Sequence, residues 1–222
     1  MPGLATYYRY RFPAEIISHA IWLYHVFSYE AVREWEAKLA LVLSDELRRR
    51  RHGKGGARCR QWHVDETYLK VRGRWCYLYR ATDRDGNLVD TMLSEHRDMA
   101  AAQAFFRSAK SATGMTPDQV TTDGHGSYPR AIRSTLGRRV IHRTSAYKNN
   151  IIEQDHRGVK GRIRCMRGFK SFASAERFCR SYDELRNHLR PCTRHNQSIP
   201  ANRRRLLQLR RATAALAILE AA

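Results

Sequence analysis

The sequence predicts an α/β fold in which helices pack on a mixed sheet, with a short helical module ahead of this domain. Three observations support the prediction. Three strand-like segments follow one another through the middle of the chain, and alternating helix and strand patterns come after them. Two helical patterns precede these strands, separated from them by a basic stretch that contains glycine. The apolar content of 42%, with 10% aromatic residues, is enough for a real core.

Two helices are predicted at the N-terminal end. Apolar residues recur at helical spacing over 13–27, and Ser28 is a suitable N-cap for a second helix. The second helix has an apolar stripe made of Val32, Trp35, Leu39 and Val42. The arginine run 48–51 and the glycines after it predict a basic, flexible linker. We therefore place an N-terminal helical module at 1–50 and a linker at 51–60.

Strand and helix signals alternate over 61–190, the predicted main domain. The predicted strands are 61–72, 74–82, 87–94, 119–122 and 138–143. The predicted helices are 99–112, 129–136, 150–167 and 173–189. Asp85-Gly86 favours a tight turn, so the first three strands should form an antiparallel meander. The remaining 191–222 is a basic C-terminal tail, helical by propensity towards its end.

The charge balance points to a polyanionic partner. Lys and Arg number 41 against 21 Asp and Glu, which gives a formal net charge of +20. Each phosphate that a basic side chain neutralises releases condensed counterions, so nucleic acid is the first partner to consider. A passive basic protein of the ribosomal kind is the alternative, and the apolar content of 42% argues against it.

Cysteine usage and hydropathy indicate the compartment. The five cysteines have neither CxxC nor zinc-ribbon spacing, and their odd number suits reduced thiols. No stretch approaches the roughly 20 apolar residues that span a bilayer. We expect a cytoplasmic, nucleoid-associated protein that is neither secreted nor embedded in a membrane.

Three carboxylates stand at positions that suggest chemistry. Asp is disfavoured within strands, yet Asp65 lies in the middle of the first predicted strand and Asp123 follows the end of another. Glu153 lies near the start of the predicted helix 150–167. In phosphoryl transfer on DNA, hard oxygen ligands hold two Mg²⁺ ions about 3.5–4 Å apart. The pattern is typical of such a metal-dependent reaction.

Each carboxylate also has a purely structural interpretation. Asp65 fits a surface position on an edge strand, and Asp123 with the following glycine fits a simple turn. Asn150-x-x-Glu153 has the spacing of a helix capping box. Glu66 should point to the opposite sheet face from Asp65, so only one of the two can face the metals.

The three carboxylates and their flanking residues resemble, in order, the DDE transposases of insertion-sequence family six. The similarity runs from about residue 61 to residue 178. Its motifs are Trp62-x-Val64-Asp65-Glu66-Thr67-Tyr68, Gly73-x-Trp75-x-Tyr77-Leu78-Tyr79-Arg80-Ala81, Thr122-Asp123-Gly124, Ser127-Tyr128, Asn149-Asn150-x-x-Glu153-x-Asp155-His156 and Gly168-Phe169-Lys170-Ser171-Phe172.

The resemblance implies a ribonuclease H-like fold and a catalytic, metal-binding triad of Asp65, Asp123 and Glu153. It implies two Mg²⁺ or Mn²⁺ ions and attack of a 3′-hydroxyl on target DNA. The implied partners are transposon ends and target DNA, bound by a homodimer or a higher oligomer.

Two departures from the family pattern leave other functions open. Phe27 runs directly into Ser28, as though one helix and turn of a helix-turn-helix were missing. The step from Asp123 to Glu153 is shorter than is typical, and the loop around Gly137 is the expected place of the shortening. The alternatives to an active transposase are a catalytically inactive, DNA-binding transposase remnant and a ribonuclease H-like nuclease.

Basic residues near the predicted triad suggest DNA contacts. His156 either assists the site or faces solvent. Arg157, Lys160 and Arg164 continue along the same side of the helix as Glu153, and we place Lys170 with them as DNA-binding. An ordinary solvated basic face is the alternative. The meander tyrosines and Trp75 are expected to pack in the core or on the sheet face, not to stack on bases.

Overall fold

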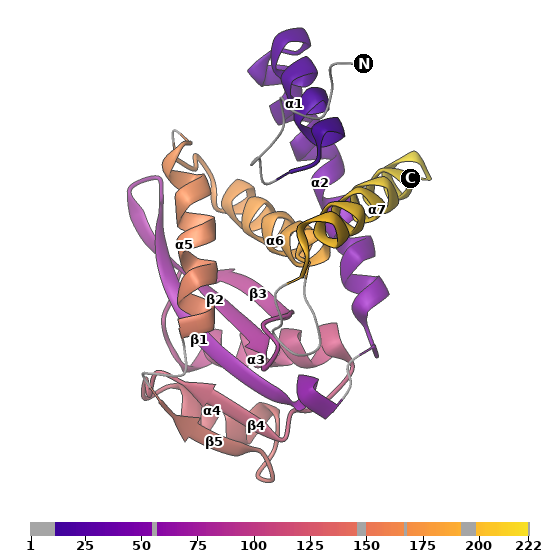
Figure 1. Ribbon diagram of the computed structural model, residues 1–222. Helices are drawn as coiled ribbons and strands as arrows, with labels where there is room; N and C mark the ends of the chain where they lie inside the picture. Colours follow the sequence, from indigo (N-terminus) through magenta and orange to yellow (C-terminus); the bar gives the residue numbers. More distant parts are fainter. Residues whose placement is uncertain (1–11, 55–56, 146–149, 167, 192–198, 222) are drawn as a thin grey trace. The chain divides into compact units, whose positions relative to one another are not determined.

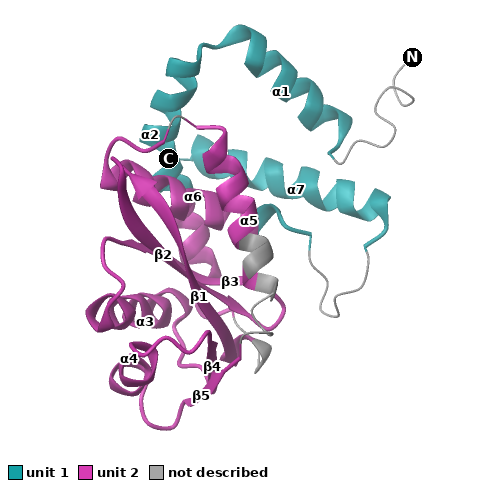
Figure 2. Cartoon of the chain, turned by 90° about the vertical axis from the view of Figure 1, so that its left-hand side faces the viewer, with its two compact units in different colours: residues 1–43, 188–222 teal, residues 44–187 magenta. Residues whose placement is uncertain are grey.

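The computed structural model describes residues 12–54, 57–145, 150–166, 168–191 and 199–221. The chain forms two compact units (Figure 2). One unit contains residues 1–43 and 188–222, and the other contains residues 44–187. The DNA-binding role of the helical module and the bounds of the tail proposed from the sequence stay predictions.

The larger unit is built on a five-stranded mixed sheet (Figure 1). Its strands are β1 (Gln61–Val71), β2 (Arg74–Asp83), β3 (Leu88–Ser94), β4 (Gln119–Thr122) and β5 (Ile141–Thr144). Their order across the sheet is β3-β2-β1-β4-β5. The first three strands form an antiparallel meander, and β4 and β5 continue the sheet parallel to β1. This is the strand arrangement of a ribonuclease H-like fold, so the predicted fold class is confirmed.

Helices cover both faces of this sheet (Figure 2). On one face α3 (Met99–Thr113) and α4 (Tyr128–Thr135) pack against the sheet. The core on this side includes Trp62, Val64, Tyr79, Phe105, Phe106 and Ile132, all buried. On the other face α5 (Asn150–Arg164) and α6 (Phe172–Leu189) pack against the sheet. This second core includes Leu69, Leu78, Val159, Ala175 and Cys179.

The turns of the meander follow the sequence signals. Arg72 and Gly73 both have positive φ, 50° and 80°, as a two-residue hairpin turn with the right-handed strand twist requires. At the predicted Asp85-Gly86 turn, the Asp83 carboxylate accepts hydrogen bonds from the backbone N–H groups of Asp85 and Asn87. The fifth strand begins at residue 141, later than the predicted 138. Gly137, at φ 105°, ends the helix before it, and a turn occupies the next three residues.

The interpretation of the arginine run as the start of a flexible linker is wrong. Helix α2 (Tyr29–Arg51) continues through all four arginines. Arg48 forms an ion pair with the buried Asp90 of β3. Arg51 donates to Glu184 of α6 at 2.7 Å and to the Val89 carbonyl at 2.7 Å. The arginine run is thus part of the larger unit. Arg48 and Arg51 are each neutralised there by a buried carboxylate.

The smaller unit contains α1 (Ala14–Val26), the first part of α2, and α7 (Ala201–Glu220). The predicted N-cap is confirmed, since the Ser28 hydroxyl accepts from the Ala31 N–H at 3.2 Å. The Phe27 ring contacts Trp35 edge-on, with 4.7 Å between ring centroids. The apolar stripe of α2 remains 40–46% exposed. Among the described residues, no helix is both long and apolar enough to cross a membrane.

Candidate functional site

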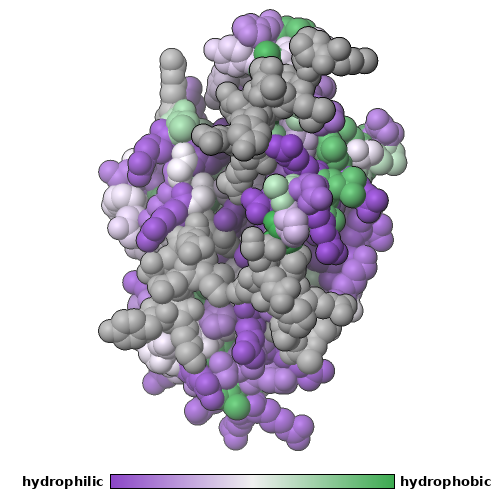
Figure 3. All heavy atoms as spheres, in the orientation of Figure 1, coloured by the Kyte–Doolittle hydropathy of each residue, from purple (hydrophilic) through white to green (hydrophobic). Residues whose placement is uncertain are grey.

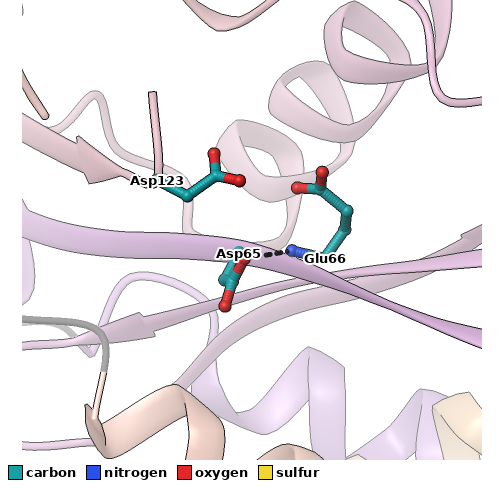
Figure 4. A group of neighbouring side chains, drawn as sticks. All are labelled: Asp65, Glu66 and Asp123. Carbon is teal, nitrogen blue, oxygen red and sulfur yellow. Dashed lines mark hydrogen bonds between the residues drawn. The ribbon is translucent and has the colours of Figure 1, made fainter. Parts of the chain in front are cut away.

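The end of a strand pairing brings the predicted carboxylates together. β1 pairs with β4 only along residues 61–63. From residue 64 onward this edge of β1 has no hydrogen-bonded partner in β4. Asp65 lies on this part of β1, and Asp123 directly follows the last residue of β4. Because β1 and β4 are parallel and adjacent, the two aspartates meet at the same place in the sheet (Figure 4).

Glu66 joins the two aspartates. Carboxylate oxygen atoms of Asp65, Glu66 and Asp123 all lie within 4.8 Å of one another, and we call these three residues the carboxylate cluster. Figure 4 shows the side chains of Asp65 and Glu66 leaving β1 in opposite directions, as strand alternation requires. The expected alternation is confirmed, while the expectation that only one of the two carboxylates faces the metals stays a prediction. At an open strand edge a glutamate side chain is long enough to lie near the neighbouring carboxylates.

Arg97 forms ion pairs with two of these carboxylates. It lies between β3 and α3, where its guanidinium hydrogen-bonds to Glu66 and, at 3.2 Å, to the Asp123 carboxylate. The next residue, Asp98, is the N-cap of α3 and accepts from the Ala101 N–H at 2.8 Å. This cap fixes the backbone from which Arg97 extends. Arg97 was not among the residues predicted for the site from the sequence.

Tyr128 is the second hydrogen-bond partner of Glu66. Its buried hydroxyl donates a hydrogen bond to the Glu66 carboxylate, which is itself only 3% exposed. Burial, and then the negative charge of Glu66, raise the pKa of Tyr128 well above its ordinary value. The tyrosine therefore stays protonated and acts as a donor. Glu66 is held between a cation and a neutral donor.

The turn after β4 fixes Asp123. Its carboxylate accepts from the His125 N–H at 3.0 Å. Gly124 has φ 95°, and a Cβ at that position would lie 2.6 Å from the Thr144 Cγ2 atom. Glycine is therefore required here. The turn interpretation of Asp123-Gly124 and the site interpretation are compatible, because the turn is what presents the carboxylate.

His156 of α5 lies against Asp65. Its Nδ1 atom is 3.9 Å from the Asp65 Oδ2 atom. Burial, and then the positive charges of Arg80 and Lys160, lower the pKa of His156 to about 3. The imidazole is therefore neutral at neutral pH, and the contact with Asp65 is not an ion pair. His156 is buried, so the solvent-facing alternative is wrong, while its assisting role stays a prediction.

Glu153 belongs to α5, three positions before His156. Its side chain lies outside the described residues, as does that of Asn150 in the capping-box alternative. The four residues predicted to bind DNA, Arg157, Lys160, Arg164 and Lys170, are all exposed. Of the meander aromatics, Tyr79 is in the core as expected, whereas Tyr68 and Trp75 pack on each other and stay more than half exposed.

The comparisons with known proteins agree with this geometry. Residues 59–191 match a family model described as a DDE domain. Two curated relatives come from Staphylococcus aureus: the transposase for insertion sequence-like element IS431mec and the transposase for insertion sequence element IS257 in transposon Tn4003. Each is 32% identical to this chain over 180 residues, which cover 71% of this chain and 78% of the relative.

The chain belongs to the DDE transposases of insertion-sequence family six. It is thus an enzyme of the polynucleotidyl-transferase type, and the family resemblance seen in its motifs is confirmed. The family match begins two residues before β1 and ends after α6, so it covers the whole sheet and all four of its packed helices.

Two solved structures show weaker similarity. One is a simian T-cell lymphotropic virus intasome in complex with PP2A regulatory subunit B56 gamma. It has a TM-score of 0.44 and 12% identity, over 63% of this chain and 56% of that one. The other is the HTLV-2 integrase catalytic core domain in complex with magnesium, in a dimeric form. It has a TM-score of 0.40 and 15% identity, over 55% of this chain and 83% of that one.

Proposed function

We propose that this transposase cuts DNA at the ends of an insertion sequence and joins the freed 3′ ends to target DNA in a metal-dependent reaction. The observation that carries the proposal is the carboxylate cluster at the open edge of β1. Carboxylate oxygens are the ligands that Mg²⁺ and Mn²⁺ prefer, and one oxygen from each of the three residues lies within 4.8 Å of the others.

Asp65, Asp123 and Glu153 are the proposed metal ligands and catalytic residues, with Glu66 at the rim of the site. Glu153 is supported by its position in α5, since residues three apart on a helix lie on the same side and His156 contacts Asp65. The three proposed ligands would hold two Mg²⁺ or Mn²⁺ ions, which would supply activation of the attacking hydroxyl and stabilisation of the leaving oxygen. The turn at Gly124 holds Asp123 in place.

DNA is the proposed partner, both as transposon ends and as target. The net charge of +20 favours phosphate binding, and the exposed Arg157, Lys160, Arg164 and Lys170 lie on α5 and in the loop before α6. A homodimer or higher oligomer would hold two transposon ends at once. Such a protein is expected at the nucleoid because its substrate is there.

A strand-transfer assay tests the proposal. The full chain is incubated with DNA that carries candidate insertion-sequence ends, a target plasmid, and Mg²⁺ or Mn²⁺. Joined products are expected with either metal and not with a chelator. Binding without joining would favour a transposase remnant that only binds DNA. Hydrolysis of an RNA–DNA hybrid without joining would favour a nuclease.

A further inference from the structure

The β1–β2 hairpin extends beyond the rest of the sheet. β3 pairs with β2 only as far as Ser94 opposite Tyr77, and β4 leaves β1 after residue 63. The hairpin tip is held on one side, where the Phe169 carbonyl accepts from the Arg72 N–H at 3.1 Å. From Arg74 to Cys76 the edge of β2 is therefore not paired with β3.

Two aromatic side chains on one face of the β1–β2 hairpin are exposed to solvent. Tyr68 is 56% exposed and Trp75 is 52% exposed. Their rings meet edge to face, with centroids 5.0 Å apart and planes at 89°. They occupy diagonal positions on the two strands, since Lys70 is the direct partner of Trp75. A cross-strand aromatic pair stabilises a hairpin, but packing alone would not leave half of each ring in water.

A lysine stands over each ring. The Lys70 Nζ atom is 4.7 Å from the Trp75 ring centroid, and the Lys160 Nζ atom is 4.7 Å from the Tyr68 ring centroid. At exposed sites such a cation–π contact contributes only about two- to fivefold to an equilibrium. A nucleobase stacked on an aromatic ring contributes about 5- to 150-fold to affinity. Stacking of a base is therefore the stronger of the two interactions with the ring, and an ammonium group that gave way to a base would lie close enough to bind a phosphate.

This surface adjoins the carboxylate cluster. Tyr68 is two residues beyond Glu66 on β1 and points to the same sheet face, about 7 Å along the strand, whereas Asp65 points to the other face. Lys160 lies one helical turn beyond His156 on α5. Lys170 borders the hairpin tip, because its carbonyl accepts a hydrogen bond from the Arg72 guanidinium. Hydrophilic residues dominate the described surface on the face shown in Figure 3.

We propose that Tyr68, Trp75, Lys70 and Lys160 form a binding site for unpaired bases of a DNA strand that leads from the carboxylate cluster. This inference rests on the proposed function, since it takes the strand to be DNA held at that cluster. The two rings stack on bases, whereas the two ammonium groups bind the flanking phosphates. The site thus favours a single strand over a paired duplex.

The test measures the affinity of the full chain for single-stranded DNA and for blunt duplex DNA of the same sequence. Both titrations are made at one salt concentration in the presence of a chelator. Tyr68→Ile and Trp75→Ile put a residue of high strand propensity in each position and remove the π face. Each is expected to weaken single-strand binding about 5- to 150-fold and to change duplex binding less than threefold. Ile141→Ala, at an equally exposed apolar position on β5, is the matched control and should change neither.

A second measurement does not depend on those variants folding well. Binding of single-stranded DNA should quench tryptophan fluorescence, and Trp75→Phe should keep the affinity but lose most of the quench. A quench that persists in Trp75→Phe, single-strand affinity within twofold of wild type in both isoleucine variants, or equal losses for both DNAs would overturn the inference. Failure of wild-type strand transfer would instead overturn the proposed function, whichever way the binding result falls.

Discussion

At the scale of single residues, Arg97 neutralises part of the negative charge of the carboxylate cluster. Its guanidinium contacts Glu66 and Asp123 at once, and these carboxylates would otherwise repel each other. Glu66, nearly buried, also accepts from Tyr128 and so is anchored more firmly than Asp123, whose side chain is 34% exposed. Arg97 is therefore both the partner of Asp123 and a competitor of any cation that Asp123 binds.

Removing this competitor should strengthen metal binding. Arg97→Ala is expected to raise Mn²⁺ affinity about fivefold or more, since the repulsion between the ion and one partly exposed unit charge a few ångströms away is on the order of 1 kcal/mol. Isothermal titration or Mn²⁺ electron paramagnetic resonance measures the change. Arg97→Lys keeps the charge and should show a smaller gain. A weaker affinity in Arg97→Ala would mean that Arg97 aligns the ligands.

Sequence reasoning reached some of these residues and not others. Asp65 and Asp123 stood out because each interrupts or ends a strand, and the structure places them together. Glu66 was set aside on strand alternation, which gives the direction of a side chain at its base but not the reach of a long one at an open edge. Arg97 has no local signal, because its partners lie 26 and 31 positions away in the sequence.

At the scale of secondary-structure elements, buried ion pairs fix α2 and α6 to the sheet. Glu184 of α6 is 1% exposed and pairs with Arg51, while Asp90 of β3 is fully buried and pairs with Arg48. Sequence patterns located these elements to within a few residues because they depend on local periodicity. They missed the end of α2 because the stabilising acceptors belong to strands and helices far along the chain.

Breaking one of these pairs should destabilise the larger unit. Glu184→Gln leaves the Arg51 guanidinium largely buried beside a neutral amide, and loss of a buried pair costs about 3–5 kcal/mol. Urea unfolding, followed by circular dichroism, should show a clearly lower midpoint. Arg49→Ala is the control, because Arg49 is exposed and pairs with Glu46 on the helix surface, and its midpoint should not change. Equal midpoints for Glu184→Gln and wild type would contradict the anchoring role.

The N-terminal helices should give poor sequence discrimination. The structure has α1 and α2 joined by a turn at Phe27 and Ser28, with the α2 stripe still exposed, whereas a working helix-turn-helix needs a braced recognition helix in the major groove. In competition titrations at fixed salt, binding to true ends should exceed binding to scrambled DNA by far less than about 10³-fold. A preference of that size would show an intact recognition module.

At the scale of the whole molecule, the excess of positive charge predicts that phosphate contacts dominate DNA affinity. Forty-one basic residues against 21 acidic ones leave a large positive excess, and the acidic residues of the larger unit are in part neutralised internally by Arg48, Arg51, Arg80 and Arg97. The remaining exposed cations are available for phosphates. Composition alone predicted this property, because it depends on totals and not on the fold.

Binding should therefore weaken steeply with salt. The logarithm of duplex affinity is expected to fall linearly with the logarithm of salt concentration. Replacing Arg157, Lys160 and Arg164 with Ala should weaken binding to all sequences alike, and the slope should fall by about one unit for each phosphate that is no longer neutralised. Fluorescence anisotropy across a salt series measures this. An unchanged slope would mean that α5 does not bind the DNA backbone.

The measurement that tests the central claim most directly is strand transfer by Asp65→Asn, Asp123→Asn and Glu153→Gln, with DNA binding measured in parallel. Each substitution removes one proposed metal-binding charge while preserving side-chain size. Each variant should therefore bind DNA about as tightly as wild type and form no joined product in Mg²⁺. Joining at a near-normal rate by any of the three variants would contradict the assignment of that residue to the metal site.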